Sequence, residues 1–114
     1  KKTDEEKAAR SAAIQAATLF ATQVPLHTMQ ASFKVFELCK AMAEEGNPNS
    51  VSDAGVGVLA ARAAVLGAGL NVKINASGLK DREAADKLVG EANELIKKAN
   101  ELETEIMKIV EDKL

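Results

Sequence analysis

Apolar residues recur every three or four positions along most of the chain, which is the spacing expected of helices with one buried face. We predict a first helix over about 4–22 and a second that begins at Pro25, because proline disfavours helical geometry in the residue before it. The pattern continues in a third helix over about 52–68 and a last helix over 81–114. It therefore predicts an all-α bundle of about four helices with a long C-terminal helix.

Local signals support these helix ends. Thr3 and Glu6 have the spacing of a capping box, and Gly46 opens a cluster of residues that break helices. The second helix is expected to bury a stripe made of Leu26, Met29, Phe33, Phe36 and Met42. The third helix has apolar residues nearly all round, as expected of the central helix of a bundle.

Residues 70–77 are the least helical part of the pattern. Leu70 to Asn75 alternate between apolar and polar residues, which is the period of a strand. A strand needs a partner, and the rest of the chain offers no second strand-like segment. We therefore predict a short irregular or extended link here, with helix as the alternative.

The last helix carries apolar residues at alternating spacings of three and four from Ala85 to Ile109. At 1.5 Å per residue it would be about 50 Å long, which exceeds the width of a compact domain of this size. Part of its stripe is therefore expected to meet another chain or a segment outside these residues, and we predict a homodimer.

Composition and charge narrow the class of protein. The chain has 114 residues, 12.0 kDa and 46% hydrophobic residues, which fits one globular domain. The net charge is −2 with both signs mixed, so we expect no nucleic-acid partner. Arg62 interrupts the longest apolar run, so we expect no membrane span. The single Cys39 is expected to be a buried free thiol, and the protein is expected to be cytoplasmic.

Two polar clusters frame the third helix. The first consists of Asn47, Asn49, Ser50, Ser52 and Asp53, and the second of Asn71, Lys73 and Asn75. A core helix does not need ends this polar, so together the clusters could form a polar pocket on an apolar scaffold.

Three segments resemble the cyclodeaminase/cyclohydrolase family of folate enzymes, namely VPL (24–26), GNPNSVSDAGVGVL (46–59) and GAGLNVKIN (67–75). The most specific part is SDAGV followed by NVKIN at this separation. The resemblance implies an all-helical dimer that is a methenyltetrahydrofolate cyclohydrolase or a formimidoyltetrahydrofolate cyclodeaminase. Because the family domain is longer at its amino end, residues 1–114 are expected to be its C-terminal part.

The resemblance implies chemistry at the one-carbon bridge between N5 and N10 of tetrahydrofolate. In the first reaction water adds to the methenyl carbon, and in the second N10 attacks the formimino carbon and ammonia leaves. Both reactions need proton transfer beside a cationic carbon, which a carboxylate supports. Asp53 is therefore the candidate catalytic residue. Lys73 is the second candidate, and it would orient a glutamate or polyglutamate tail of the folate or polarise a pterin oxygen. We expect the side chains of Asp53 and Lys73 to line one cavity.

Asn47, Ser52, Asn71 and Asn75 are the candidate substrate-binding residues, because their side chains can hydrogen-bond to a pterin edge. No set of His, Cys and carboxylate residues has metal-ligand spacing. We therefore expect no metal and no cofactor, with a tetrahydrofolate derivative as the substrate.

Each candidate also has a purely structural interpretation. Asp53 would complement a helix macrodipole, and Lys73 would be a solvated lysine. The two asparagines after the third helix would satisfy backbone groups, while a turn or cap is the favoured role for Asn47 and Ser52. His27 is the only histidine and is expected at a surface or an interface. If all these interpretations hold, the chain is a non-catalytic helical dimerisation module.

Overall fold

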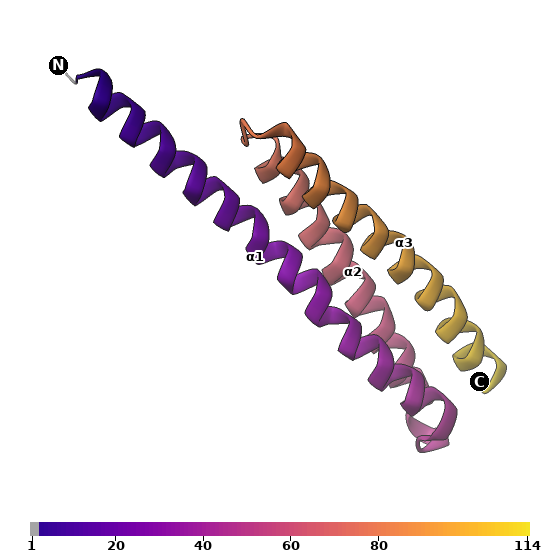
Figure 1. The fold of residues 1–114 in the computed structure, drawn as a ribbon. Helices are drawn as coiled ribbons and strands as arrows, with labels where there is room; N and C mark the ends of the chain where they lie inside the picture. The colour runs from indigo at the N-terminus through magenta and orange to yellow at the C-terminus, as the bar shows by residue number, and fades with distance from the viewer. Residues whose placement is uncertain (1–2) are drawn as a thin grey trace.

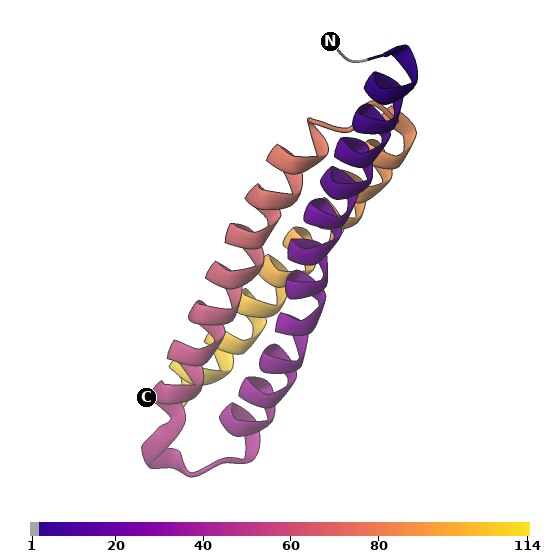
Figure 2. The same ribbon diagram turned by 90° about the vertical axis from the view of Figure 1, so that its left-hand side faces the viewer.

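The structure is a computed structural model, and it describes residues 3–114. These residues form three long α-helices and one short 3-10 helix, with the bounds α1 Asp4–Glu45, η1 Pro48–Ser50, α2 Val51–Ala76 and α3 Arg82–Asp112. Consecutive helices run antiparallel and pack side by side (Figure 1, Figure 2). The all-α class and the long C-terminal helix are confirmed, whereas the number of helices is three rather than four.

The predicted break at Pro25 is wrong, because α1 runs through it. In a regular α-helix the N–H of residue 25 would donate to the carbonyl of Ala21, and proline has no N–H. Asn75 supplies the missing donor, since its Nδ2 lies 2.9 Å from the Ala21 carbonyl oxygen. Thr22 and Leu26, on either side of the gap, are buried and hold α1 against its neighbours.

The predicted irregular link is also wrong, because residues 70–76 are the last turns of α2. Val72 and Ala76 are buried while Leu70 and Ile74 are exposed. The sequence of this segment therefore fits both the alternating pattern of a strand and the four-residue spacing of a helix. Burial of Val72 in the shared core decides in favour of helix, and this tertiary contact outweighs the weak helix propensity of Val, Ile and Asn.

The predicted helix starts are confirmed at both ends of the chain. The Thr3 hydroxyl accepts a hydrogen bond from the Glu6 backbone N–H at 3.1 Å, as a capping box requires. Asp81 is the N-cap of α3, and its Oδ1 accepts from the Ala84 N–H at 3.1 Å. The observed bounds of α3 lie within two residues of the expected ones.

The main core lies between the three helices. α3 contributes a fully buried heptad stripe of Ala85, Ala92, Ala99 and Ile106. These four residues pack on α1 and α2 of the same chain, whereas Leu88, Leu95, Leu102 and Ile109 of the same pattern are only partly buried. The expectation that part of the stripe meets another chain or a further segment stays a prediction. Cys39 is a buried free thiol, as predicted.

The opposite surface of the α1–α2 pair is apolar and uncovered. On α2, Val56, Leu59, Leu70 and Ile74 are 65, 45, 69 and 68% exposed. On α1 the exposed large residues include Phe20, Val24, Val35, Leu38 and Met42. Met42 was predicted to be buried, and its 46% exposure corrects that prediction. α2 therefore contacts α1 and α3 but is not enclosed on all sides.

The molecule is elongated, with extents of 68 × 19 × 15 Å. Its radius of gyration is 19.2 Å, against about 13 Å for a compact domain of this length. Its accessible surface of 7329 Å² exceeds the roughly 6,000 Å² typical of a folded monomer of this mass. The chain thus exposes about 1,300 Å² more surface than a typical monomer.

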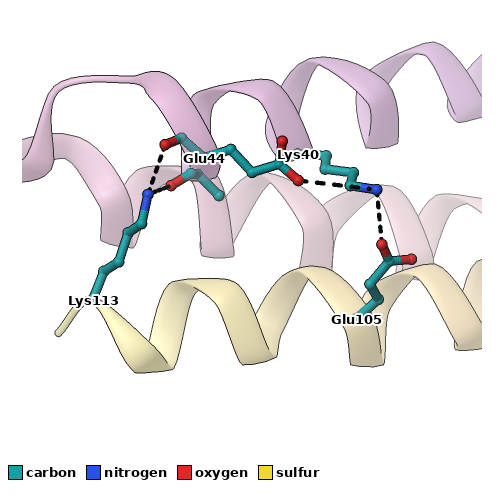
Figure 3. Close-up of polar contacts among 5 residues, drawn as sticks. Lys40, Glu44, Glu105 and Lys113 are labelled. Atoms are coloured by element: carbon teal, nitrogen blue, oxygen red, sulfur yellow. Dashed lines mark hydrogen bonds and ion pairs between the residues drawn. The ribbon is translucent and has the colours of Figure 1, made fainter.

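Polar contacts fasten the end of the molecule where α1 turns into η1 (Figure 3). Lys113 Nζ donates to the carbonyl oxygens of Ala43 and Glu44 at 2.6 and 2.7 Å. The last turn of α1 has no basic residue of its own, so α3 provides the cation that stabilises a helix C-terminus. Lys40 Nζ lies 2.8 Å from Glu105 Oε1 and ties the same two helices together.

Residues 48–76 form a helical segment that is long and apolar enough to cross a membrane, with a mean hydropathy of 1.5 and 39% of its most apolar window buried. Core helices of soluble proteins share this length and composition. The expectation of no membrane partner therefore stays a prediction.

Candidate functional site

A groove of about 550 Å³ lies between α1 and α2. Its lining consists of Val24, Pro25, Thr28, Ala63, Ala64, Gly67, Ala68, Asn71 and Asn75. The α2 side of the floor is made of alanine and glycine, so space remains where larger side chains would fill it. The volume is in the range of small-molecule pockets, which is roughly 300–1,000 Å³.

The polar groups of the groove come from both walls. Asn71 and Asn75 are one helical turn apart on α2 and line the groove together. Asn75 donates to the Ala21 carbonyl, so its Nδ2 is engaged in the helix contact. The Asn71 side chain is exposed and is the polar group most open to a ligand. Thr28 Oγ1 donates back to the Val24 carbonyl at 3.3 Å.

The structure does not bring Asp53 and Lys73 together. Asp53 lies in the first turn of α2 and Lys73 in its last. About 20 residues of continuous helix separate them by roughly 30 Å along the axis and turn them to nearly opposite faces. Neither residue lines the groove. One chain alone therefore cannot form the cavity that was expected to contain both.

The other candidates at the start of α2 also lie outside the groove. Asn47 is the N-cap of η1, and its Oδ1 accepts from the Asn49 N–H at 2.9 Å, which confirms the turn-making role. Ser50 is the N-cap of α2 but makes no side-chain capping bond. Ser52 is exposed. His27 is exposed too, as predicted, and lies in a different groove between α1 and α3.

Sequence reasoning missed the α1 wall of the groove, which includes Pro25 and Thr28. The signal was present, because two of the segments that carry the family resemblance, VPL and GAGLNVKIN, face each other across it. Treating Pro25 as the start of a separate helix concealed this arrangement.

The groove offers hydrogen bonds but no acid or base. Its lining contains amides, a hydroxyl and apolar groups, and no titratable side chain. Carboxamides both donate and accept, which suits the edge of a heterocycle, and an apolar floor suits its flat face. A group that transfers protons must therefore reach the groove from outside its lining.

Two groups with a shifted pKa, Lys40 and Cys39, lie outside the groove lining. The hydrogen bond and charge of Glu105 raise the pKa of the Lys40 ammonium, in the contact drawn in Figure 3. Burial raises the pKa of the Cys39 thiol. Both effects belong to the packing of α1 against its neighbours.

Comparison with known proteins agrees with the resemblance. Residues 1–94 match the family described as Formiminotransferase-cyclodeaminase, so the chain belongs to the formiminotransferase-cyclodeaminase family. Over all 114 residues it is 46% identical to the methenyltetrahydrofolate cyclohydrolase of Methylorubrum extorquens, of which it covers 55%. Over 104 residues, 91% of the chain, it is 34% identical to the formimidoyltransferase-cyclodeaminase of Dictyostelium discoideum, of which it covers 19%. The chain thus spans about half the length of the first relative and less of the second.

Proposed function

We propose that the protein acts in folate one-carbon metabolism, as a methenyltetrahydrofolate cyclohydrolase that opens the N5/N10 bridge. The 46% identity over the whole chain to a protein of that name is the observation that carries the proposal. The groove supports it, because the VPL and GAGLNVKIN segments meet there around an apolar floor and two carboxamides. Formimidoyltetrahydrofolate cyclodeaminase is the second candidate, favoured by the similarity to the Dictyostelium protein.

In this proposal the α1–α2 groove holds the reacting part of the folate. Asn71 binds a polar edge of the pterin, and Asn75 contributes its side-chain oxygen while its nitrogen is held by Ala21. Asp53 remains the candidate for proton transfer and for stabilising the cationic carbon, and because it does not line the groove of its own chain it would reach the folate only from another copy of the chain. Lys73, Asn47 and Ser52 are left outside the reacting site, because none of them lines the groove.

We also propose that the chain is the C-terminal part of a cyclodeaminase/cyclohydrolase-like domain and works as a cytoplasmic homodimer, without metal or nucleic acid. The partial coverage of the relatives supports the first part. The uncovered apolar surface of α1 and α2 supports the second.

Two assays test the function. Hydrolysis of 5,10-methenyltetrahydrofolate is followed by the loss of its ultraviolet absorbance, and formimino substrate is tested in parallel by ammonia release. We expect saturable turnover of the methenyl compound above the uncatalysed rate. Turnover of the formimino compound alone would favour the cyclodeaminase. If the protein neither turns over nor binds either compound, the remaining interpretation is a non-catalytic dimerisation module.

A further inference from the structure

We propose that the α1–α2 groove selects its ligand by an edge of N–H donors. Asn75 presents its side-chain oxygen to the groove, where it accepts from the 2-amino and N3–H groups of a pterin, and O4 of the same ring lies beside Asn71. The polarity of the groove follows from the contacts of its lining residues. The assignment of the pterin rests on the proposed function.

The first observation is the fixed orientation of the Asn75 amide. Its Nδ2 lies 2.9 Å from the Ala21 carbonyl oxygen of α1. A carbonyl oxygen only accepts, so this contact needs the amide nitrogen. Turning the amide over would set two oxygen atoms against each other, and Pro25 has no N–H that could bond to Ala21 in place of Asn75. Oδ1 is therefore the atom that is left for a ligand.

The second observation is that the helix walls offer acceptors. The lining residues lie inside α1 and α2, where each N–H donates to the carbonyl four residues earlier, and Pro25 has no N–H at all. The Thr28 hydroxyl directs its hydrogen to the Val24 carbonyl oxygen at 3.3 Å, so its lone pairs are left for the groove. The lining contains no lysine, arginine or histidine. An anionic ligand thus finds few partners here, whereas N–H donors find several.

The third observation is the pair of carboxamides. Asn71 is exposed in the groove, so its amide can turn to donate or to accept. Residues four apart on a helix have Cβ atoms about 5–6 Å apart, which suits neighbouring groups on one edge of a heterocycle. The pyrimidine edge of a pterin carries the 2-amino donor, the N3–H donor and the O4 acceptor in that order. The two donors match Asn75 Oδ1, and O4 matches the amide nitrogen of Asn71.

This match fixes the direction of the folate in the groove. N5 is bonded to the ring carbon beside C4, so it lies beyond O4 and away from the 2-amino group. With the 2-amino group at Asn75, N5 and its one-carbon bridge lie towards Gly67 and Ala64. Nothing lies within 4 Å of a Cβ at Gly67, so this end of the groove has space for the bridge.

Binding of two small pteridines tests the donor edge without any assay of activity. Pterin carries the 2-amino group, and lumazine carries an oxygen at the same carbon. Fluorescence titration of the wild-type chain, at a pH where both compounds are neutral, gives the two affinities. We expect pterin to bind at least about tenfold more tightly, because lumazine sets its oxygen against Asn75 Oδ1.

Two substitutions isolate the orientation of the amide. Pro25→Ala restores an N–H for Ala21 and frees the Asn75 amide to turn, so the preference for pterin should fall below about threefold. Adding Asn75→Asp supplies only acceptor oxygens, so the preference should return to about tenfold or more. Asn93→Asp, at an exposed position of α3, brings the same charge elsewhere and should leave the wild-type preference unchanged.

Gly67→Leu tests the direction of the bound folate. The leucine fills the space assigned to the bridge, so the affinity for 5-formyltetrahydrofolate, which carries one carbon on N5, should fall by about tenfold or more. Pterin has no such carbon and should bind as before. Gly90→Leu on α3, where a Cβ also has open space, is the matched control and should change neither affinity.

Each result decides one part of the inference. Equal binding of pterin and lumazine to the wild-type chain, or a preference that survives Pro25→Ala, would overturn the donor edge. Binding of neither compound would overturn the assignment of the pterin, and an unchanged affinity of Gly67→Leu for 5-formyltetrahydrofolate would overturn the direction.

Turnover is a separate result. If the wild-type chain prefers pterin but does not hydrolyse methenyltetrahydrofolate, the proposed function fails and the donor edge stands. If it hydrolyses methenyltetrahydrofolate but binds lumazine as tightly as pterin, the function stands and the inference fails.

Discussion

Asn75 Nδ2 lies 2.9 Å from the carbonyl oxygen of Ala21, the acceptor that Pro25 leaves without its helical donor. A side chain of α2 therefore completes the backbone hydrogen bonding of α1. The same asparagine lines the groove between the two helices. Helix continuity and groove geometry consequently depend on one contact.

This relationship predicts coupling between Asn75 and Pro25. We expect Asn75→Ala to lower the free energy of unfolding by about 1 kcal/mol, the usual value of such a hydrogen bond. With Pro25→Ala the backbone N–H returns, so the same asparagine substitution should cost less than half as much. Urea unfolding of the four chains in a double-mutant cycle measures the difference. Equal costs in both backgrounds would show that Asn75 does not replace the missing donor.

Asn71 should affect activity and not stability. Its side chain is exposed in the groove, so Asn71→Ala should change the free energy of unfolding by less than about 0.5 kcal/mol. Loss of its hydrogen bonds to the folate should reduce kcat/KM about tenfold. Asn93→Ala, an exposed asparagine on α3, is the matched control and should leave both quantities unchanged. Equal activity of the two variants would place the substrate elsewhere.

Gly57 and Gly90 should respond oppositely to alanine. Nothing lies within 4 Å of a Cβ at Gly90, so Gly90→Ala should stabilise the protein by about 1 kcal/mol through helix propensity. A Cβ at Gly57 would lie 2.7 Å from Cys39 Sγ, so Gly57→Ala should destabilise it. Repeating Gly57→Ala with Cys39→Ala removes the sulfur and should reverse the sign. Thermal unfolding measures all four variants, and a destabilising Gly57→Ala in both backgrounds would contradict this account.

Cys39 predicts a specific pH dependence. Burial raises the pKa of its thiol, so the folded chain holds the proton more tightly than the unfolded chain does. Its contribution to stability is therefore complete below the pKa of a free thiol, about 8.5, and is lost as the pH rises from there through the pKa in the folded protein. The difference in unfolding free energy between the parent and Cys39→Ala should fall between neutral pH and pH 10. A constant difference would show that the thiol is not shielded.

The fold was predictable wherever local signals and burial agreed. The capping box at Thr3, the N-cap at Asp81 and the heptads of α3 required nothing beyond neighbouring residues. Pro25 and the segment from Leu70 to Asn75 were misjudged because distant contacts decide them. A hydrogen bond from Asn75 repairs the helix at Pro25, and burial of Val72 selects the helical spacing.

The candidate site was predictable in composition and not in arrangement. Asn71 and Asn75 were identified, and the structure places both in one groove. Asp53 and Lys73 were expected to meet because they belong to the two polar clusters that frame an apolar helix and that carry the family resemblance. A continuous α2 keeps them apart. Pro25 and Thr28 were missed because the α1 wall becomes visible only when α1 is one helix.

At Pro25 one main-chain carbonyl of α1 is satisfied by a side chain of α2 that also lines the groove. Any ligand that draws the Asn75 amide nitrogen to itself would therefore leave the Ala21 carbonyl without a donor, and the energy of that lost hydrogen bond would be subtracted from the affinity.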